Sequence, residues 1–163
     1  METPSGPVTI ILTEAAGLGM DIGVKGGGAA PVIPARILLV DDYRDALDMW
    51  GTYLRSRGYD VLTASDGLMA MEIANHELPD LIILDLDLPG ITGCEAARRL
   101  RSSEPTALIP LIAATGFSQG KELAEARASG FDVVLIKPCD PTELVNEIER
   151  ALDHRPAGPQ RVM

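Results

Sequence analysis

The chain has 163 residues, of which 46% are hydrophobic and only 4% aromatic, and its formal net charge is −10. This length fits one domain with extra chain, and the acidic balance argues against a nucleic-acid partner, which requires clustered Lys and Arg. No apolar stretch reaches the length of a membrane span, and the first Lys or Arg is Lys25, too late for a signal peptide. We therefore expect a cytoplasmic protein with no membrane partner.

Residues 1–35 differ in composition from the rest of the chain, because they hold seven Gly and four Pro. We predict a flexible N-terminal extension that ends in a linker. The triplet at residues 26–28 is not a phosphate-binding loop, since no Gly-Lys-Ser/Thr follows it. The two cysteines, Cys94 and Cys139, lack the spacing of a thiolate metal site and are expected to be unpaired.

From residue 36 onward, apolar runs alternate with segments of helical periodicity. The first helix has Ala46, Leu47, Trp50 and Leu54 at spacings of three and four, and Gly58 is expected to end it. We expect Trp50 and Tyr53 to pack this helix rather than to line a ligand site.

The other helices are predicted from their ends. Ser65 or Asp66 would cap the second helix, and the third starts near Gly93. The fourth covers roughly 119–129, and the fifth begins at Asp140-Pro141. The predicted strands are residues 37–40, 59–63, 81–84, 108–114 and 131–136.

Five strands alternating with five helices predict an α/β fold with a parallel sheet covered on both faces. Right-handed crossovers leave few topologies. We expect the flavodoxin-like (βα)5 doubly wound sheet with strand order 2-1-3-4-5.

Polar residues follow the predicted strands at their carboxyl ends, where ligands bind in such sheets. Asp41 and Asp42 follow the first strand, Asp85 the third, Thr115 the fourth and Lys137 the fifth. In the predicted order these ends are neighbours. Three carboxylates in one place repel unless a cation joins them, and oxygen ligands suit Mg²⁺. With a Lys and a hydroxyl, the set matches what phosphoryl transfer to an Asp requires.

The sequence resembles the receiver domains of the two-component response-regulator family over roughly residues 36–153. The motifs that carry the resemblance are Val40-Asp41-Asp42, the segment from Leu84 to Gly90 with Gly93 beyond it, Ala114-Thr115-Gly116 and Lys137-Pro138. The resemblance implies a phospho-accepting module that receives its phosphoryl group from a histidine kinase or a histidine phosphotransfer protein and then signals by a conformational change.

The resemblance also implies a role for each matching residue. Asp85 would be the phospho-acceptor. Asp41, Asp42, Asp85 and the backbone carbonyl of Asp87 would hold Mg²⁺, with no other cofactor. Thr115 would hydrogen-bond the phosphoryl group, Lys137 would pair with Asp85, and the bond before Pro138 would be cis. One position departs from the family pattern: Val134 stands where an aromatic residue often couples the switch hydroxyl to the output face.

We expect three segments: the extension at 1–35, the receiver domain at 36–153 and a polar C-terminal tail at 154–163. No second folded domain is expected after residue 153, so the chain would be a single-domain or hybrid-kinase-type receiver without DNA-binding output and without small-molecule turnover. One alternative is a haloacid-dehalogenase-type phosphatase, because Asp85-Leu86-Asp87 imitates its Asp-x-Asp pair, although that family places the pair after its first strand. The other is a phosphorylation-independent interaction module.

Overall fold

The computed structural model describes residues 32–116 and 120–156. Most of the predicted N-terminal extension, the predicted start of the fourth helix at Gln119 and the end of the predicted tail lie outside these ranges. Contacts divide the chain into two units, Met1–Pro34 and Ala35–Met163, and the helices and strands of the described residues belong to the second. Within the described ranges, no helix combines the length and the apolar character that a membrane span requires.

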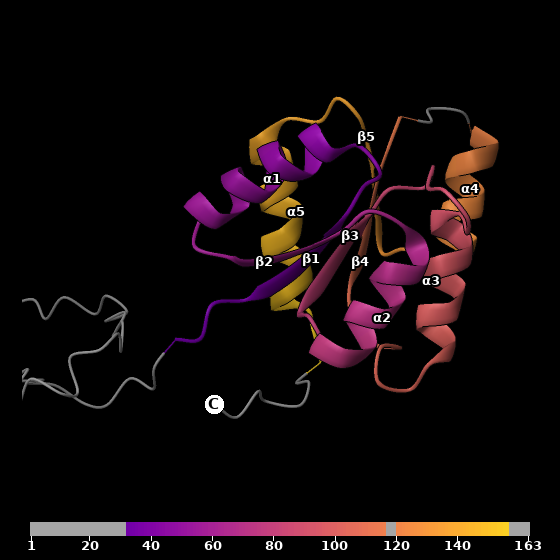
Figure 1. The fold of residues 1–163 in the computed structure, drawn as a ribbon, viewed down its shortest axis with the longest axis horizontal. Helices are drawn as coiled ribbons and strands as arrows, with labels where there is room; N and C mark the ends of the chain where they lie inside the picture. The colour runs from indigo at the N-terminus through magenta and orange to yellow at the C-terminus, as the bar shows by residue number, and fades with distance from the viewer. Residues whose placement is uncertain (1–31, 117–119, 157–163) are drawn as a thin grey trace, which may run out of the picture. The chain divides into compact units, whose positions relative to one another are not determined.

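Five parallel strands form one sheet in the order β2-β1-β3-β4-β5 (Figure 1). This order confirms the predicted flavodoxin-like topology. The register places Val40, the last residue of β1, opposite Ala64 of β2 and Leu84 of β3, so the strands that carry acidic residues end at the same level. The strands are β1 Arg36–Val40, β2 Asp60–Ala64, β3 Leu81–Leu84, β4 Leu111–Thr115 and β5 Val133–Ile136.

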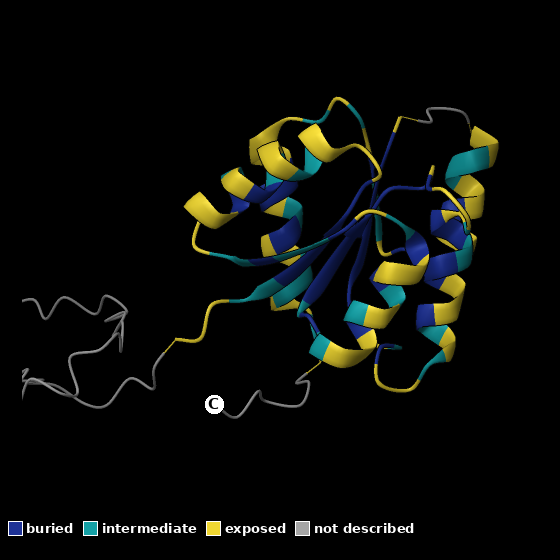
Figure 2. Ribbon diagram, in the orientation of Figure 1, coloured by how far each residue is buried: buried dark blue, intermediate teal, exposed yellow. Residues whose placement is uncertain are grey.

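Helices cover both faces of the sheet. Helices α1 (Arg44–Ser56) and α5 (Pro141–Asp153) lie on one face, and α2 (Gly67–Glu77), α3 (Gly93–Ser102) and α4 (Gly120–Ala128) lie on the other (Figure 1). Successive strand residues point to opposite faces, so Ile37 packs with the α1–α5 layer and Leu38 with the α2–α4 layer. Both faces are covered, which explains why β3 and β4 are buried along their whole length and are apolar except for Thr115 at the end of β4 (Figure 2).

Local signals set the ends of several helices where the sequence predicted them. The carboxylate of Asp66, not Ser65, caps α2 by accepting a hydrogen bond of 2.8 Å from the backbone N–H of Met69. Asp140 caps α5 with Pro141 as its first residue. Beyond the end of α1, Gly58 has a φ of +92°, a conformation that side chains with a Cβ rarely adopt.

The predicted start of the fourth strand at residue 108 was wrong, because β4 begins at Leu111. Leu108 is 72% exposed and lies in a turn before the strand. The guanidinium of Arg101 accounts for this turn, since it donates hydrogen bonds of 2.8 and 2.6 Å to the carbonyls of Ala107 and Ile109. The second and fifth strands also begin one and two residues later than predicted, at Asp60 and Val133, because an apolar run does not show where ladder pairing starts.

The first residues of the predicted polar tail contact the folded domain. Arg155 forms an ion pair with Asp80, whose carboxylate also accepts a hydrogen bond of 2.7 Å from the backbone N–H of Arg36. The chain after α5 is therefore anchored at the edge of the sheet where β1 begins, opposite the edge where the strands end.

Candidate functional site

The predicted site residues meet at the carboxyl edge of the sheet. Asp41 and Asp42 directly follow β1, Asp85 follows β3 and Lys137 follows β5, while Thr115 is the last residue of β4. Strands β1, β3, β4 and β5 are successive neighbours in the sheet, so residues 52 and 96 positions apart in sequence come into direct contact.

Three carboxylates form the acidic part of the site. One oxygen from each of Asp41, Asp42 and Asp85 lies within 4.8 Å of the others. Asp41 and Asp85 are buried, with 5% and 8% of their surface exposed, whereas Asp42 is open to solvent. The backbone holds both buried carboxylates: the N–H of Tyr43 donates to Asp41 Oδ1 at 2.9 Å, and the N–H of Asp87 donates to Asp85 Oδ1 at 3.1 Å.

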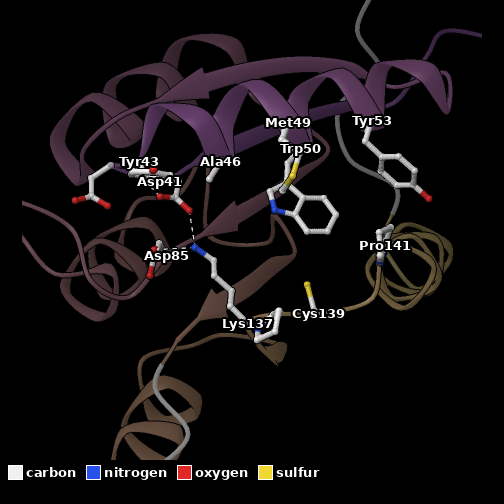
Figure 3. A pocket seen from close by; sticks show the side chains of 12 residues that line it. Asp41, Tyr43, Ala46, Met49, Trp50, Tyr53, Asp85, Lys137, Cys139 and Pro141 are labelled. Atoms are coloured by element: carbon white, nitrogen blue, oxygen red, sulfur yellow. Dashed lines mark hydrogen bonds and ion pairs between the residues drawn. The ribbon is translucent and has the colours of Figure 1, made fainter.

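The ammonium of Lys137 bridges the two buried carboxylates. Its Nζ lies 2.5 Å from Asp41 Oδ2 and 3.0 Å from Asp85 Oδ2 (Figure 3). Burial lowers the pKa of Lys137, but the hydrogen bonds and attraction from Asp41 and Asp85 outweigh it, so the pKa lies above its usual value. The lysine is therefore charged at neutral pH, and one positive charge faces three carboxylates.

Thr115 and Lys137 are also joined through the backbone. The N–H of Lys137 donates a hydrogen bond of 2.7 Å to the carbonyl of Thr115, and Thr115 has no exposed surface. The peptide bond between Lys137 and Pro138 is cis, as the resemblance implied. The hydroxyl residue and the ammonium residue thus extend from neighbouring strand ends.

The loop after β3 comes unusually close to the start of α3. The N–H of Gly93 donates to the carbonyl of Leu86 at 2.9 Å, and a Cβ on Gly93 would lie only 2.1 Å from the carbonyl oxygen of Asp85. Glycine is therefore required at this position. Asp87, in the same loop, is exposed, and the metal-binding role of its carbonyl stays a prediction.

Comparison with known proteins agrees with this geometry. Residues 37–149 match the family of response regulator receiver domains. The chain belongs to that family. Receivers are not a family of enzymes that turn over small molecules, and they interact with histidine kinases or phosphotransfer proteins.

Curated relatives of this receiver are longer proteins. The DNA-binding dual master transcriptional regulator RpaA of Synechocystis is 37% identical over 125 residues, which are 77% of this chain and 52% of RpaA. The CAI-1 autoinducer sensor kinase/phosphatase CqsS of Vibrio cholerae is 34% identical over 69% of this chain and 17% of CqsS. This chain therefore spans about half or less of these two relatives.

Solved structures match this fold along all or nearly all of their own length. A response regulator from Chloroflexus aurantiacus is 31% identical with a TM-score of 0.72, and the match covers 75% of this chain and all of that one. The receiver domain of the sensor histidine kinase PA1611 from Pseudomonas aeruginosa is 30% identical with a TM-score of 0.70, over 74% and 99% of the two chains. That PA1611 structure has a magnesium ion coordinated in its active-site cleft.

The acidic cluster of this receiver fits a hard divalent cation. Its donors are all carboxylate oxygens, which suit Mg²⁺ better than soft metals. With Lys137 paired, three carboxylates and one ammonium leave an excess of two negative charges, which a divalent ion would neutralise.

An apolar cavity beside the acids is a part of the site that the sequence did not predict. It has a volume of about 650 Å³ and lies between α1 and the loop from β5 to α5 (Figure 3). Trp50 and Tyr53 pack against the α1–α5 core as expected, but they also line this cavity. Their predicted packing role is confirmed. Met49, beside them on α1, is 60% exposed. An apolar residue on the polar side of this helix was the one sequence signal that could have indicated the cavity.

Proposed function

We propose that this chain is a phospho-accepting receiver of a two-component phosphorelay, phosphorylated on Asp85 in a Mg²⁺-dependent reaction. The donor would be the phosphohistidine of a kinase or phosphotransfer protein. The observation that carries the proposal is the contact between the buried Asp85 carboxylate and the Lys137 ammonium at 3.0 Å, beside two further carboxylates.

The proposed transfer needs only the groups at the strand ends. An oxygen of Asp85 attacks phosphorus, the bond from phosphorus to the donor imidazole nitrogen breaks, and its electron pair stays on the imidazole. The product is an acyl phosphate on Asp85. Lys137 would donate to a phosphoryl oxygen as its pair with Asp85 loosens, and Thr115 would donate its hydroxyl to another. Both groups would stabilise negative charge on the transferring phosphoryl group.

Asp41, Asp42 and Asp85 would hold the Mg²⁺ ion, with the carbonyl of Asp87 as a backbone ligand. The bound ion would neutralise charge on the phosphoryl oxygens and fix their orientation. Support comes from the spacing of the three carboxylates in this chain and from the ion in the PA1611 receiver.

The domain limits are part of the proposal. The receiver would cover residues 36–153, with a linker before it and a tail after it whose first residues contact Asp80 through Arg155. RpaA and several other relatives are named as DNA-binding, which describes those longer proteins. We propose that residues 36–153 themselves bind a phosphodonor protein and a protein partner rather than DNA, because the chain is acidic.

The test is incubation of the full chain with Mg²⁺ and acetyl phosphate, read by intact mass. We expect the addition of one phosphoryl group to the wild type. No group should be added when a metal chelator is present from the start, or to Asp85→Asn. Asp48→Asn is the matched control, because the Asp48 side chain is 74% exposed on α1 and lies outside the site, and it should label like the wild type.

Each contrary result identifies an alternative. Labelling of Asp85→Asn would overturn the assignment of the acceptor. No Mg²⁺-dependent labelling of the wild type would favour the phosphorylation-independent interaction module. Repeated turnover of a small phosphoester would favour the phosphatase, although Asp85-Leu86-Asp87 follows β3 here and not the first strand.

A further inference from the structure

The apolar cavity next to the acids has the size of a small-molecule site. Its volume of about 650 Å³ falls within the range of roughly 300–1,000 Å³ that ligand pockets occupy. Phosphoryl transfer to Asp85 uses groups at one end only, which leaves the rest of the cavity without a role in that chemistry.

The two ends of the cavity differ in chemistry. At one end are Asp41, Asp85 and Lys137, and at the other are apolar side chains from two elements, as Figure 3 shows. Asp42 belongs to the acidic end. Trp50 and Tyr53 stand edge to face, with ring centroids 6.1 Å apart and planes at 82°, and Cys139 and Pro141 lie across from them. Aromatic and apolar walls of this kind favour a ligand with an aromatic or branched apolar body.

The charge at the acidic end decides which head group such a ligand would carry. Lys137 already pairs with Asp41 and Asp85, and Asp42 adds a third, solvent-open carboxylate within 4.8 Å. The local excess of negative charge repels an anionic head group and attracts a cation. A neutral ligand would leave this excess uncompensated.

We propose that this cavity binds small amphipathic amines in the metal-free receiver. The ammonium would lie against Asp42 and Asp85, and the apolar body against Met49, Trp50 and Cys139. Because the ammonium would use the carboxylates assigned to Mg²⁺, amine and metal would compete. Only this competition rests on the proposed function, whereas binding of the amine to the metal-free chain does not.

The direct test is calorimetric titration of the metal-free full chain with 2-phenylethylamine, repeated by fluorescence of Trp50, the single tryptophan of the chain. We expect saturable binding and a change in Trp50 emission. 2-Phenylethanol, which lacks the charge, 3-phenylpropionate, which reverses it, and ethylamine, which lacks the apolar body, should each bind roughly tenfold more weakly or not at all.

Matched variants locate the two ends of the ligand. Asp42→Asn and Met49→Ser change exposed side chains of the cavity, so both variants should fold. Each should lower the affinity for 2-phenylethylamine by roughly fivefold or more. Asp48→Asn and Met69→Ser make the same changes at exposed positions outside the cavity and should leave the affinity unchanged. Added Mg²⁺ should raise the apparent Kd of the amine, and the rise should be linear in the Mg²⁺ concentration.

The outcomes separate this inference from the proposed function. Equal binding of 2-phenylethanol and 2-phenylethylamine, or equal loss in the control variants, would overturn the amine site. Amine binding that is insensitive to saturating Mg²⁺ would overturn the competition. If no amine binds while acetyl phosphate still labels Asp85, the inference fails and the proposed function stands.

Discussion

Asp85 sits where electrostatic forces oppose one another. Its carboxylate is attracted to the Lys137 ammonium at 3.0 Å, but it shares the space with two other carboxylates within 4.8 Å. Lys137 lies closer to Asp41, at 2.5 Å, so it would keep a partner if Asp85 lost its charge. Without a metal, like-charge repulsion should therefore exceed what the pair with Lys137 contributes. A protein whose site is adapted to bind a cation is expected to be less stable without the cation than a variant in which one of the site's charges is removed.

This balance predicts the effect of Asp85→Asn on stability. In metal-free buffer, the variant should be more stable than the wild type by about 1 kcal/mol, because one of three crowded charges is removed. Urea unfolding followed by circular dichroism would measure this. Mg²⁺ should narrow the difference, since it stabilises the wild type more than the variant.

Asp48→Asn is the control for this comparison, because its carboxylate is exposed and outside the cluster. It should change the free energy of unfolding by less than about 0.5 kcal/mol. A loss of stability in Asp85→Asn would show that the pair with Lys137 dominates over the repulsion.

At the scale of elements, α3 fixes the loop that carries Asp85. Thr92 caps the helix, and its first residue, Gly93, approaches the backbone of Asp85 and Leu86 so closely that no Cβ fits. The neighbours are backbone atoms, which cannot give way as a flexible side chain would. Any larger residue must therefore separate α3 from the end of β3.

Gly93→Ala should reduce the free energy of unfolding by about 1–3 kcal/mol through this overlap. Gly120→Ala is the matched control: Gly120 begins α4, and a Cβ there would meet no atom within 4 Å. That change should be neutral or stabilising by about 0.5 kcal/mol, because alanine loses less entropy on folding. Urea unfolding measures both, and equal effects would contradict the role given to Gly93.

The β5 element differs from the family pattern at Val134. Its side chain is half-buried and packs against the core on the α2–α4 face. A branched aliphatic residue in this position cannot make the rotation of an aromatic ring. Any response of α4 or β5 to phosphorylation must therefore use backbone or packing shifts.

For the whole molecule, one sheet serves two separate cores. Neighbouring residues of β3 point to opposite faces: Ile82 packs with the α2–α4 layer and Ile83 with the α1–α5 layer. Because both layers rest on the same strands, neither can persist when the sheet unfolds. The domain should consequently unfold in one cooperative step.

Ile82→Ala tests this cooperativity. The residue is fully buried, and its truncation should cost about 2–5 kcal/mol. Trp50 reports on the opposite core, so its fluorescence should shift to lower urea together with the circular dichroism signal. A shift in circular dichroism without a matching shift in Trp50 fluorescence would show that the two layers unfold independently.

The sequence by itself determined the class of fold and predicted which polar residues gather at the carboxyl ends of the strands. Apolar runs of strand length, helical periodicity and caps such as Asp140-Pro141 are local properties, and each depends on residues close together in the chain. Right-handed crossovers left few strand orders, of which 2-1-3-4-5 is a common one. The acids, Thr115 and Lys137 were singled out because each lies at the carboxyl end of a predicted strand.

Tertiary structure decided what depends on residues distant in sequence. The turn that delays β4 is held by Arg101, and the bridge from Lys137 to both Asp41 and Asp85 spans the sheet. The apolar cavity exists only because α1 and the β5–α5 loop, some ninety residues apart by the numbering of Met49 and Cys139, face each other across the acids. No local pattern encodes such an approach, since its energy comes from packing and charge between separate elements.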